Sequence, residues 1–361
     1  MRIVSTSHSS ARPVANWILI GVFMLLIQVI LGGITRLTGS GLSITEWNVI
    51  TGTLPPLSEG KWIEEFSKYK QTPQYHFLNT DFTLRDFKFI FFWEWLHRFW
   101  ARLIGIVFIV GFVYLVSKKL LKKSMEKPLL ILFLLGALQG AIGWIMVASG
   151  LTGDAVYVKP TRLALHFTFA LALICYAYWF ALQLLVPPAQ KVPARSVKIW
   201  TWIIVVLLFL QLIYGALMAG HKAATASPSW PTINGMIVPD SIFSEKPLLL
   251  DLVENKITIH FIHRGLAYLL FLATLLLTIK LFRVSRVSSA LRKVRVIPFF
   301  LVCLQMVLGI AAVLTSTGIV PNHWGTFEWM AQLHQIVAML FLLSLTTILY
   351  LTSAKSFMQL S

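Results

Sequence analysis

Long apolar stretches separated by short polar connections dominate the hydropathy pattern of this chain. Eight of them reach about 20 residues, the length that a helix needs to cross the hydrocarbon core of a bilayer. Backbone polar groups inside lipid must be satisfied within the segment, so each stretch predicts a helix. The expected spans are residues 16–34, 89–116, 128–148, 162–186, 198–219, 257–281, 296–314 and 329–353.

The composition agrees with an all-α membrane protein of eight transmembrane helices. Hydrophobic residues make up 57% of the 361 residues and charged residues 12%, and the mean hydropathy is +0.76. These values exclude a soluble enzyme.

The net charge of +17 is explained by topology and not by a nucleic-acid partner. Of the 31 Lys and Arg residues, 17 lie in the two tails and in alternate loops, which is the positive-inside pattern. Both termini are therefore expected on the cytoplasmic side, and connections 35–88, 149–161, 220–256 and 315–328 on the outer side. The 17 are Arg2, Arg12, Lys118, Lys119, Lys122, Lys123, Lys127, Lys191, Arg195, Lys198, Lys280, Arg283, Arg286, Arg292, Lys293, Arg295 and Lys355.

Two pairs of histidines indicate an internal duplication. His97 precedes His263 by 166 residues and His166 precedes His334 by 168, and the first pair shares a following arginine. The duplication predicts two pseudo-symmetric four-helix bundles, one in residues 1–187 and one in residues 188–361.

A second repeat runs through the odd-numbered spans, each of which carries Gln followed four residues later by Gly. Glycine permits close approach of helices and glutamine can bond across them, so the expected role is packing, with direct cofactor contact as the alternative. The pairs are Gln28 and Gly32, Gln139 and Gly143, Gln211 and Gly215, and Gln305 and Gly309.

The four histidines are candidate axial ligands of two haem groups. Each lies about 8–12 Å inside the outer end of its span, given the rise of 1.5 Å per residue. Neutral imidazole is the common axial ligand of haem iron, and a pair of imidazoles suits electron transfer. Zinc fits less well, because Cys, Asp or Glu partners at ligand spacing are missing from the other spans.

The two halves differ three residues before the first histidine, where Glu94 stands in one and His260 in the other. Residues three apart share a helix face, so one site has a carboxyl group beside its ligand. A glutamate inside a span is costly and indicates proton handling. The structural alternative is that Glu94 pairs with Arg98.

Five arginines near the outer span ends are candidates for contact with haem propionates, since guanidinium groups recognise carboxylates. Anchoring of the helices at the membrane interface is the alternative. They are Arg36, Arg98, Arg102, Arg162 and Arg264. The longest outer connection, 35–88, is rich in aromatic residues and proline, including Trp47, and is expected to form an ordered cap over the first-half site.

Several strings together resemble the haem A synthase family of the mitochondrial and proteobacterial type. They are RLTGSGLSITEWNVITGTLPPL at 36–57, DFKFIFFWEWLHRFWARLIG at 86–105, SWPTINGMIVP at 229–239, HFIHR at 260–264 and QLHQ at 332–335. The resemblance covers nearly the whole chain.

The resemblance implies a membrane monooxygenase that converts the C8 methyl group of haem O to a formyl group by successive hydroxylations, yielding haem A for terminal oxidases. His97 and His166 would then flank the substrate haem O, and Glu94 would be the catalytic acid. His263 and His334 would ligate the iron of a resident haem b.

The resemblance also suggests the partners and the location. Haem O, an external electron donor, membrane lipid, the farnesyltransferase that forms haem O, oxidase assembly factors and a second copy of the chain are expected; nucleic acid is not. The N-terminal segment is too short for an organelle transit peptide. A bacterial inner membrane is therefore expected, with the haem sites toward the periplasm.

One departure from the family and two mechanistic questions stand beside this interpretation. Some family members carry outer-loop cysteine pairs, whereas Cys175 and Cys303 both fall inside spans here, so an outer disulfide is not expected. His260 is a competing candidate ligand to His263. Two histidines on substrate iron leave no vacant position for oxygen, so either one ligand leaves or water supplies the oxygen.

Two other functional classes fit part of the pattern. A dihaem b-type electron-transfer cytochrome explains the four histidines equally well, but it does not explain why only one half has Glu94 and the long loop. A transporter built from repeats leaves the paired histidines unexplained.

Overall fold

The computed structural model describes residues 11–46, 53–284, 288–320 and 323–353. These residues contain eight helical segments that are long and apolar enough to cross a membrane, and no β-strand. Arg2, Trp47, Arg286 and Lys355 lie outside the described residues. The eight segments are α2 (Arg12–Leu37), α5 (Leu84–Ser117), α6 (Lys123–Ala148), α7 (Pro160–Leu185), α8 (Arg195–Gly220), α10 (Lys256–Val284), α11 (Ser289–Val294) continuing through α12 (Ile297–Thr315), and α13 (Thr326–Leu351).

The eight predicted spans are confirmed, and most of the helices extend a few residues beyond the apolar runs. At the start of α5, the Thr83 side chain accepts from the Asp86 N–H, and the Asp86 carboxylate accepts from the Thr83 N–H at 2.9 Å. This reciprocal capping box begins the helix five residues before the apolar stretch. Pro160 begins α7, where its missing N–H costs no helical hydrogen bond.

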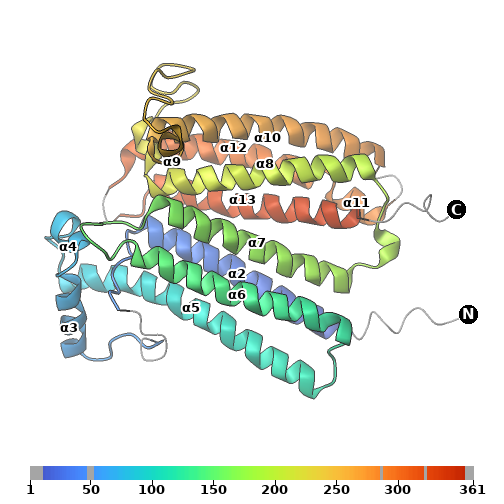
Figure 1. Ribbon diagram of the computed structural model, residues 1–361, viewed down its shortest axis with the longest axis horizontal. Helices are drawn as coiled ribbons and strands as arrows, with labels where there is room; N and C mark the ends of the chain where they lie inside the picture. The colour runs from blue at the N-terminus through green and yellow to red at the C-terminus, as the bar shows by residue number, and fades with distance from the viewer. Residues whose placement is uncertain (1–10, 47–52, 285–287, 321–322, 354–361) are drawn as a thin grey trace, which may run out of the picture.

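The long helices run side by side, and three of the short helices lie at one end of the bundle (Figure 1). At that end lie α3 (Glu59–Tyr69), α4 (Pro73–Leu78) and α9 (Leu248–Glu254). The beginning of α2 and the end of α13 lie at the opposite end. The connections predicted to face outward therefore lie at one end of the bundle, opposite the beginning of α2 and the end of α13.

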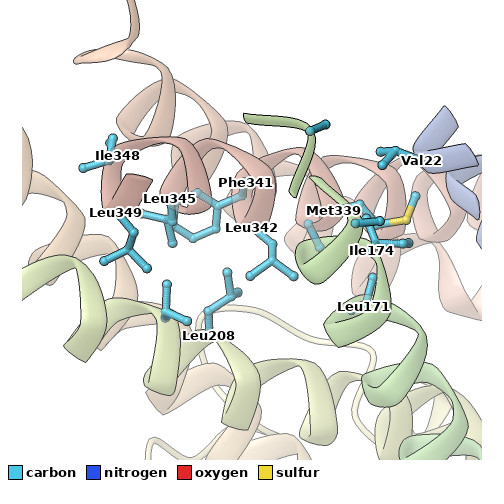
Figure 2. Close-up of a cluster of buried hydrophobic side chains, with 14 of the residues drawn as sticks. Val22, Leu171, Ile174, Leu208, Met339, Phe341, Leu342, Leu345, Ile348 and Leu349 are labelled. Carbon is cyan, nitrogen blue, oxygen red and sulfur yellow. The ribbon is translucent and has the colours of Figure 1, made fainter. Parts of the chain in front are cut away.

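Helix α13 is the central element of the packing. It contacts α12 and α8 within its own half and α2 and α7 of the first half, and α7 also packs on α8. Figure 2 shows the resulting core, in which apolar side chains of α7, α8 and α13 meet those of α2. The core includes Val22, Leu171, Ile174, Leu208, Met339, Phe341, Leu342, Leu345, Ile348 and Leu349.

Two glutamines of α13 join the halves through the backbone of α2. Gln332 donates to the carbonyl of Ile30 at 3.2 Å, and Gln335 donates to the carbonyl of Val29 at 2.8 Å. Gly33 lies beneath both amide groups, and any side chain there would collide with them. The absence of a side chain at Gly33 thus lets the two helices approach closely enough to share these bonds.

The outer connection 35–88 forms an ordered cap in its described part, as predicted. Tyr69 is fully buried in an aromatic cluster, accepts from the Asn79 amide at 2.7 Å and donates to Gln74 at 3.0 Å. Burial raises the pKa of this phenol to about 12. Gln74 also donates to the carbonyl of Val156 at 3.3 Å, which ties the cap to the next outer loop. The cluster consists of Phe66, Tyr69, Phe82, Phe87, Ile90 and Phe91.

Candidate functional site

A cavity of about 1550 Å³ extends through both halves of the bundle. His97 of α5, His166 of α7, His263 of α10 and His334 of α13 all line it, together with residues from the other four long helices. The chain therefore brings the four predicted ligands to one internal space. Among the described residues, no group of three or more His, Cys, Asp and Glu side chains is arranged to hold a bare metal ion.

The Gln and Gly repeat of α2 forms a cradle for the first histidine. The Cβ of any residue replacing Gly32 would lie 3.0 Å from Cε1 of His97. One turn earlier, Nε2 of Gln28 lies 3.1 Å from Nε2 and 3.3 Å from Nδ1 of the same ring, and it donates to the His97 carbonyl at 3.1 Å. The repeat thus fixes both the backbone and the ring of His97.

The same cradle recurs three more times, each between an odd-numbered span and the span that follows it. At the Gly143, Gly215 and Gly309 positions a Cβ would lie 2.8, 3.3 and 2.8 Å from Cε1 of the facing imidazole. Those imidazoles belong to His166, His263 and His334. The predicted packing role is therefore confirmed. Every glycine of the repeat packs against one of the four histidines and leaves room for its ring.

The four glutamines share an unsatisfied atom, because the Oε1 of each is buried without a hydrogen-bond partner. In Gln28 and Gln139 the amide nitrogen lies 3.1–3.4 Å from both ring nitrogens of the facing histidine. It also donates to the carbonyl of that histidine, at 3.1 and 3.2 Å. These two amides therefore hold the histidine backbone and contact the edge of the ring.

The pair in the second half is spaced for one metal ion. The rings of His263 and His334 have centroids 6.4 Å apart. A metal–imidazole bond is about 2.0–2.1 Å long, so this separation of the rings leaves room for one iron atom between them. Nδ1 of His334 lies 3.0 Å from the Gln305 carbonyl, which orients this ring with Nε2 available. The residues present therefore fit a haem with two axial imidazoles.

Glu94 is held by three donors at the edge of the cavity. Its Oε2 accepts from the Ser43 hydroxyl at 2.7 Å and the Ile44 N–H at 2.9 Å, and its Oε1 accepts from Arg98 at 2.6 Å. The carboxyl group is only 3% exposed and lines the cavity. The pairing with Arg98 considered above is thus present, and it coexists with access to the site.

Arg98 and Arg264 occupy equivalent positions and bind equivalent loops. Arg98 donates to the carbonyls of Ile44 and Glu46, both at 3.2 Å. Arg264 donates to the Thr232 carbonyl at 3.0 Å and, through its other nitrogen, to the Ser229 carbonyl at 2.7 Å. Each guanidinium group therefore orders the outer loop over its own half while still lining the cavity.

The other three candidate arginines are distributed unequally. Arg36 and Arg102 line the cavity, Arg36 beside the first half and near the buried Glu328 of α13. Arg162 donates to the Ile145 carbonyl at 3.0 Å and is not among the lining residues. Arg36 and Arg102 are thus placed to meet a bound carboxylate, whereas Arg162 holds the end of α6.

His260 differs sharply from Glu94, whose position it takes in the second half. It is fully buried, it lines the cavity, and neither ring nitrogen has a hydrogen-bond partner. The cradle glycine Gly215 faces His263 and not His260. This geometry favours His263 as the second-half ligand on α10.

Some residues of the site carry no sequence signal. Ser43 supplies a donor to Glu94 from 51 positions away, and nothing in its spacing indicates that contact. Tyr157 and Lys222 come from outer loops of different halves and bond at 2.6 Å beside the cavity. Both cysteines, Cys175 and Cys303, are free, as expected.

The fold and the site together define a polytopic helical membrane protein that presents two pairs of imidazoles to one internal cavity. The chain belongs to the cytochrome oxidase assembly protein family, whose model matches residues 15–346.

Its curated relatives include several bacterial proteins named heme A synthase. The chain is 39% identical over 347 residues to the protein of Flavobacterium psychrophilum, and the aligned region covers 94% of this chain and 98% of the relative. It is 44% identical over 262 residues to that of Rhodospirillum centenum, covering 72% and 70%. The protein of Wolbachia pipientis subsp. Culex pipiens is 39% identical over 305 residues, covering 84% and 89%.

Proposed function

We propose that this protein is a haem A synthase, which oxidises the C8 methyl group of haem O to a formyl group. The name shared by its relatives over most of the chain supports this function. The observation that carries it is the unequal pair of sites: two cradled histidine pairs line one cavity, but only the first has a glutamate three residues before a ligand, where the second has His260. The dihaem cytochrome alternative has no support from these relatives.

The two halves take different roles in this proposal. In residues 188–361, His263 and His334 hold a resident haem b, which supplies electrons one at a time when bound. In residues 1–187, His97 and His166 hold the substrate haem O. The chain provides the positions of the imidazoles, the shape of the cavity and the groups that move protons.

The oxidation is a monooxygenase-type reaction in two hydroxylations. Each one takes one dioxygen molecule, two electrons and two protons, leaves one oxygen atom on the methyl carbon and releases one water molecule. The second gives a geminal diol, which loses water to form the aldehyde. An external electron donor would supply the four electrons, and His263 and His334 would hold the haem b that relays them.

Glu94 delivers protons to the first-half site. Its carboxyl group lines the cavity and is connected through Ser43 to the outer loop. Arg98 compensates its negative charge, so an ionised glutamate can be kept in an apolar segment. Arg36 and Arg102 bind haem propionates, and the cap of residues 53–83 limits access of water.

The orientation follows from the charge pattern. Basic loops face the cytoplasm, so the capped end with both haem sites faces the periplasm of a bacterial inner membrane. Haem O arrives from the farnesyltransferase that makes it, and haem A leaves toward oxidase assembly factors. A homo-oligomer in the lipid bilayer completes the proposed assembly.

The test is chromatography and mass analysis of haems extracted from the purified protein, expressed with a source of haem O under ¹⁸O₂. Haem B together with haem A whose formyl group contains ¹⁸O supports the proposal, provided that exchange with water is corrected. In Glu94→Ala, haem O or its hydroxylated form should accumulate. Haem B alone in both proteins, with haem O present in the same membranes, would favour the dihaem cytochrome.

A further inference from the structure

The cavity is not equally deep in the two halves. In the first half its lining continues along α5 past His97 through Ile104, Gly105, Phe108 and Ile109. These lie 7, 8, 11 and 12 residues after the histidine, which places them on the same face of the helix. The cavity therefore runs from the histidines toward the end of the bundle where α2 begins.

The opposite wall of this extension is equally apolar. Gly136 and Gly140 of α6 line it, and Gly21 of α2 lines it near its deep end. Phe133 stacks on Phe108 with ring centroids 6.3 Å apart, and Trp17 lies 5.1 Å from Phe108, so these three rings form its floor. Trp17 precedes Gln28 by 11 residues, which is about 16 Å along a helix. We call the space bounded by Ile104, Gly105, Phe108, Phe133, Gly136 and Gly140 the tail lobe.

Three glycines keep the tail lobe open. A Cβ added at Gly105, Gly136 or Gly140 would meet no other atom within 4 Å. Glycine inside a helix is destabilising by roughly 0.5–1 kcal/mol relative to alanine, and helix packing does not require it at these three places. These positions favour space over helix stability.

The second half has side chains where the first half has these glycines. The 166-residue offset that aligns His97 with His263 and Gln139 with Gln305 aligns Gly105 with Phe271 and Gly140 with Met306. It also aligns Gly136 with Val302, and the side chains of Val302 and Met306 line the cavity where the first half has glycines. The ring of Phe271 lies 5.7 Å from that of Phe299, and neither ring lines the cavity.

The helix packing differs in the same sense. Helices α10 and α12 pack directly against each other, whereas α5 and α6 are not among the closely packed pairs of the described helices. In the most apolar stretch of each helix, the share of residues buried inside the protein is 33% for α10 and 28% for the α11–α12 segment. The corresponding share is 6% for α5 and 0% for α6. Beyond Leu270, Val302 and Met306, which still line the cavity, the equivalent space is closed in the second half, whereas in the first half it is open.

We propose that the tail lobe receives the farnesyl chain of the substrate haem, and that its closure in the second half reserves that site for a haem without the chain. This inference rests on the proposed function, because haem O carries a farnesyl group that haem b lacks. Lipid is as apolar as the lobe, so selection comes from shape and packing rather than from hydrophobic transfer. A haem without the chain leaves the lobe unfilled, and a haem with it does not fit between Phe271 and Phe299.

The test fills the lobe with the residues that the second half uses. Gly105→Phe and Gly140→Met are the test variants, and Leu134→Phe is the control, because Leu134 is exposed on α6 and does not line the cavity. The full-length protein, purified with haem b in its second half, is titrated with haem O and separately with haem B. Binding to the first half is followed by difference absorption.

Each test variant should bind haem O at least tenfold more weakly, about 1.4 kcal/mol. Its affinity for added haem B should stay within twofold of the wild-type value, and Leu134→Phe should match the wild type for both. Retention of haem b reports that the variant is folded. If a bulky variant loses haem b, Gly136→Ala and Gly140→Ala decide instead, because each methyl enters open space and should weaken haem O binding in a graded way.

Unchanged haem O affinity in folded variants overturns the tail-lobe proposal, as does equal weakening of haem O and haem B. If the wild-type protein forms haem A while these variants bind haem O normally, the tail-lobe proposal fails and the proposed reaction stands. If wild type binds haem O in a lobe-dependent way but forms no haem A, the proposed reaction fails and the lobe stands. Occupation of the lobe only by a lipid chain would leave haem O affinity insensitive to all the variants, which also overturns the proposal.

Discussion

The backbone of Gly309 lies so close to the imidazole of His334 that a Cβ would stand 2.8 Å from its Cε1. Gly143 has the same relationship to His166, and Gly32 and Gly215 have looser versions of it with His97 and His263. A contact below 3.0 Å requires one of the two groups to move, and here the imidazole of a proposed iron ligand would have to move. The effect of adding one methyl group should therefore depend on which histidine it faces.

We expect Gly309→Ala to lose most of its haem b, because the methyl displaces His334 from its position opposite His263. Gly143→Ala should keep its haem b and instead lose binding of haem O. Gly318→Ala is the control, since a Cβ there meets nothing within 4 Å. Haem content per protein and the absorption spectrum of the reduced protein measure both effects. Loss of haem b in Gly143→Ala would contradict the assignment of the two halves.

Gln211 should not act as an outer-shell partner of His263, although it belongs to the same repeat. Its side-chain Nε2 lies 3.3 Å from Nε2 of His263, the atom assigned to iron, so bound haem b replaces this contact. Gln305 contacts His334 through its main-chain carbonyl, which a side-chain substitution leaves in place. Gln211→Leu and Gln305→Leu should therefore both release haem b at the wild-type rate. Release about tenfold or more faster from Gln211→Leu would show instead that this amide supports the ligand.

The Ser43 hydroxyl should matter for the reaction and not for cofactor retention. A hydrogen bond to a charged group contributes about 1.5–3 kcal/mol, so Ser43→Ala should leave Glu94 poorly held and slow haem A formation roughly tenfold. Glu94→Gln should slow it by about a hundredfold or more, the usual contribution of a positioned acid or base. Both variants should retain haem b. Ser40→Ala is the matched control, because Ser40 is also buried but bonds to Thr38.

The stability of the third outer connection, residues 220–256, should depend on pH through Asp251. This carboxylate is buried in α9 and accepts from the Thr258 hydroxyl at 2.6 Å and the Asn255 amide at 2.8 Å. Burial raises the pKa of Asp251, but these bonds and the Glu245 N–H lower it by more than burial raises it. The pKa of Asp251 therefore lies below its ordinary value.

A depressed folded-state pKa means that Asp251 stabilises the fold above its unfolded pKa, and that this stabilisation is lost as the pH falls through the folded value. The midpoint temperature of thermal unfolding in detergent should therefore decrease when the pH is lowered below about 4. Asp251→Asn should have a lower midpoint at pH 7 and a flatter dependence on pH. Exposed Asp240 provides the control variant Asp240→Asn, which should follow the wild-type curve. A wild-type dependence in Asp251→Asn would show that another group is responsible.

The sequence predicted the eight helices and singled out the four histidines that line the cavity, because both depend on local pattern; the role of these histidines as ligands stays a prediction. Apolar runs of spanning length permit only helices in lipid, and the duplicated histidines keep their spacing whatever the helix packing is. The Gln and Gly repeat was also visible, and its packing role was expected. Its contacts with the histidines were not expected, because they join different helices whose rotation no single segment defines.

The hydrogen-bonded network around Glu94 and the shape of the cavity lay beyond prediction for a related reason. Ser43 reaches Glu94 only because the outer loop folds back over α5, and that path depends on Arg98 binding the loop carbonyls. Gly105 and Gly140 are unremarkable in a membrane helix until the distance between α5 and α6 is known. Long-range placement decides both features, whereas composition and periodicity report only on single segments.

The joint between α2 and α13 also determines how far apart the two haem sites lie. Gln335 follows His334 directly and bonds to Val29, which follows Gln28, the residue in contact with His97. The ligands of the two proposed haems are therefore connected by one short chain of covalent and hydrogen bonds that crosses between the halves. If electrons pass from haem b to the substrate haem, the tunnelling distance is a fixed property of this joint, and the transfer rate does not depend on motion of one half against the other.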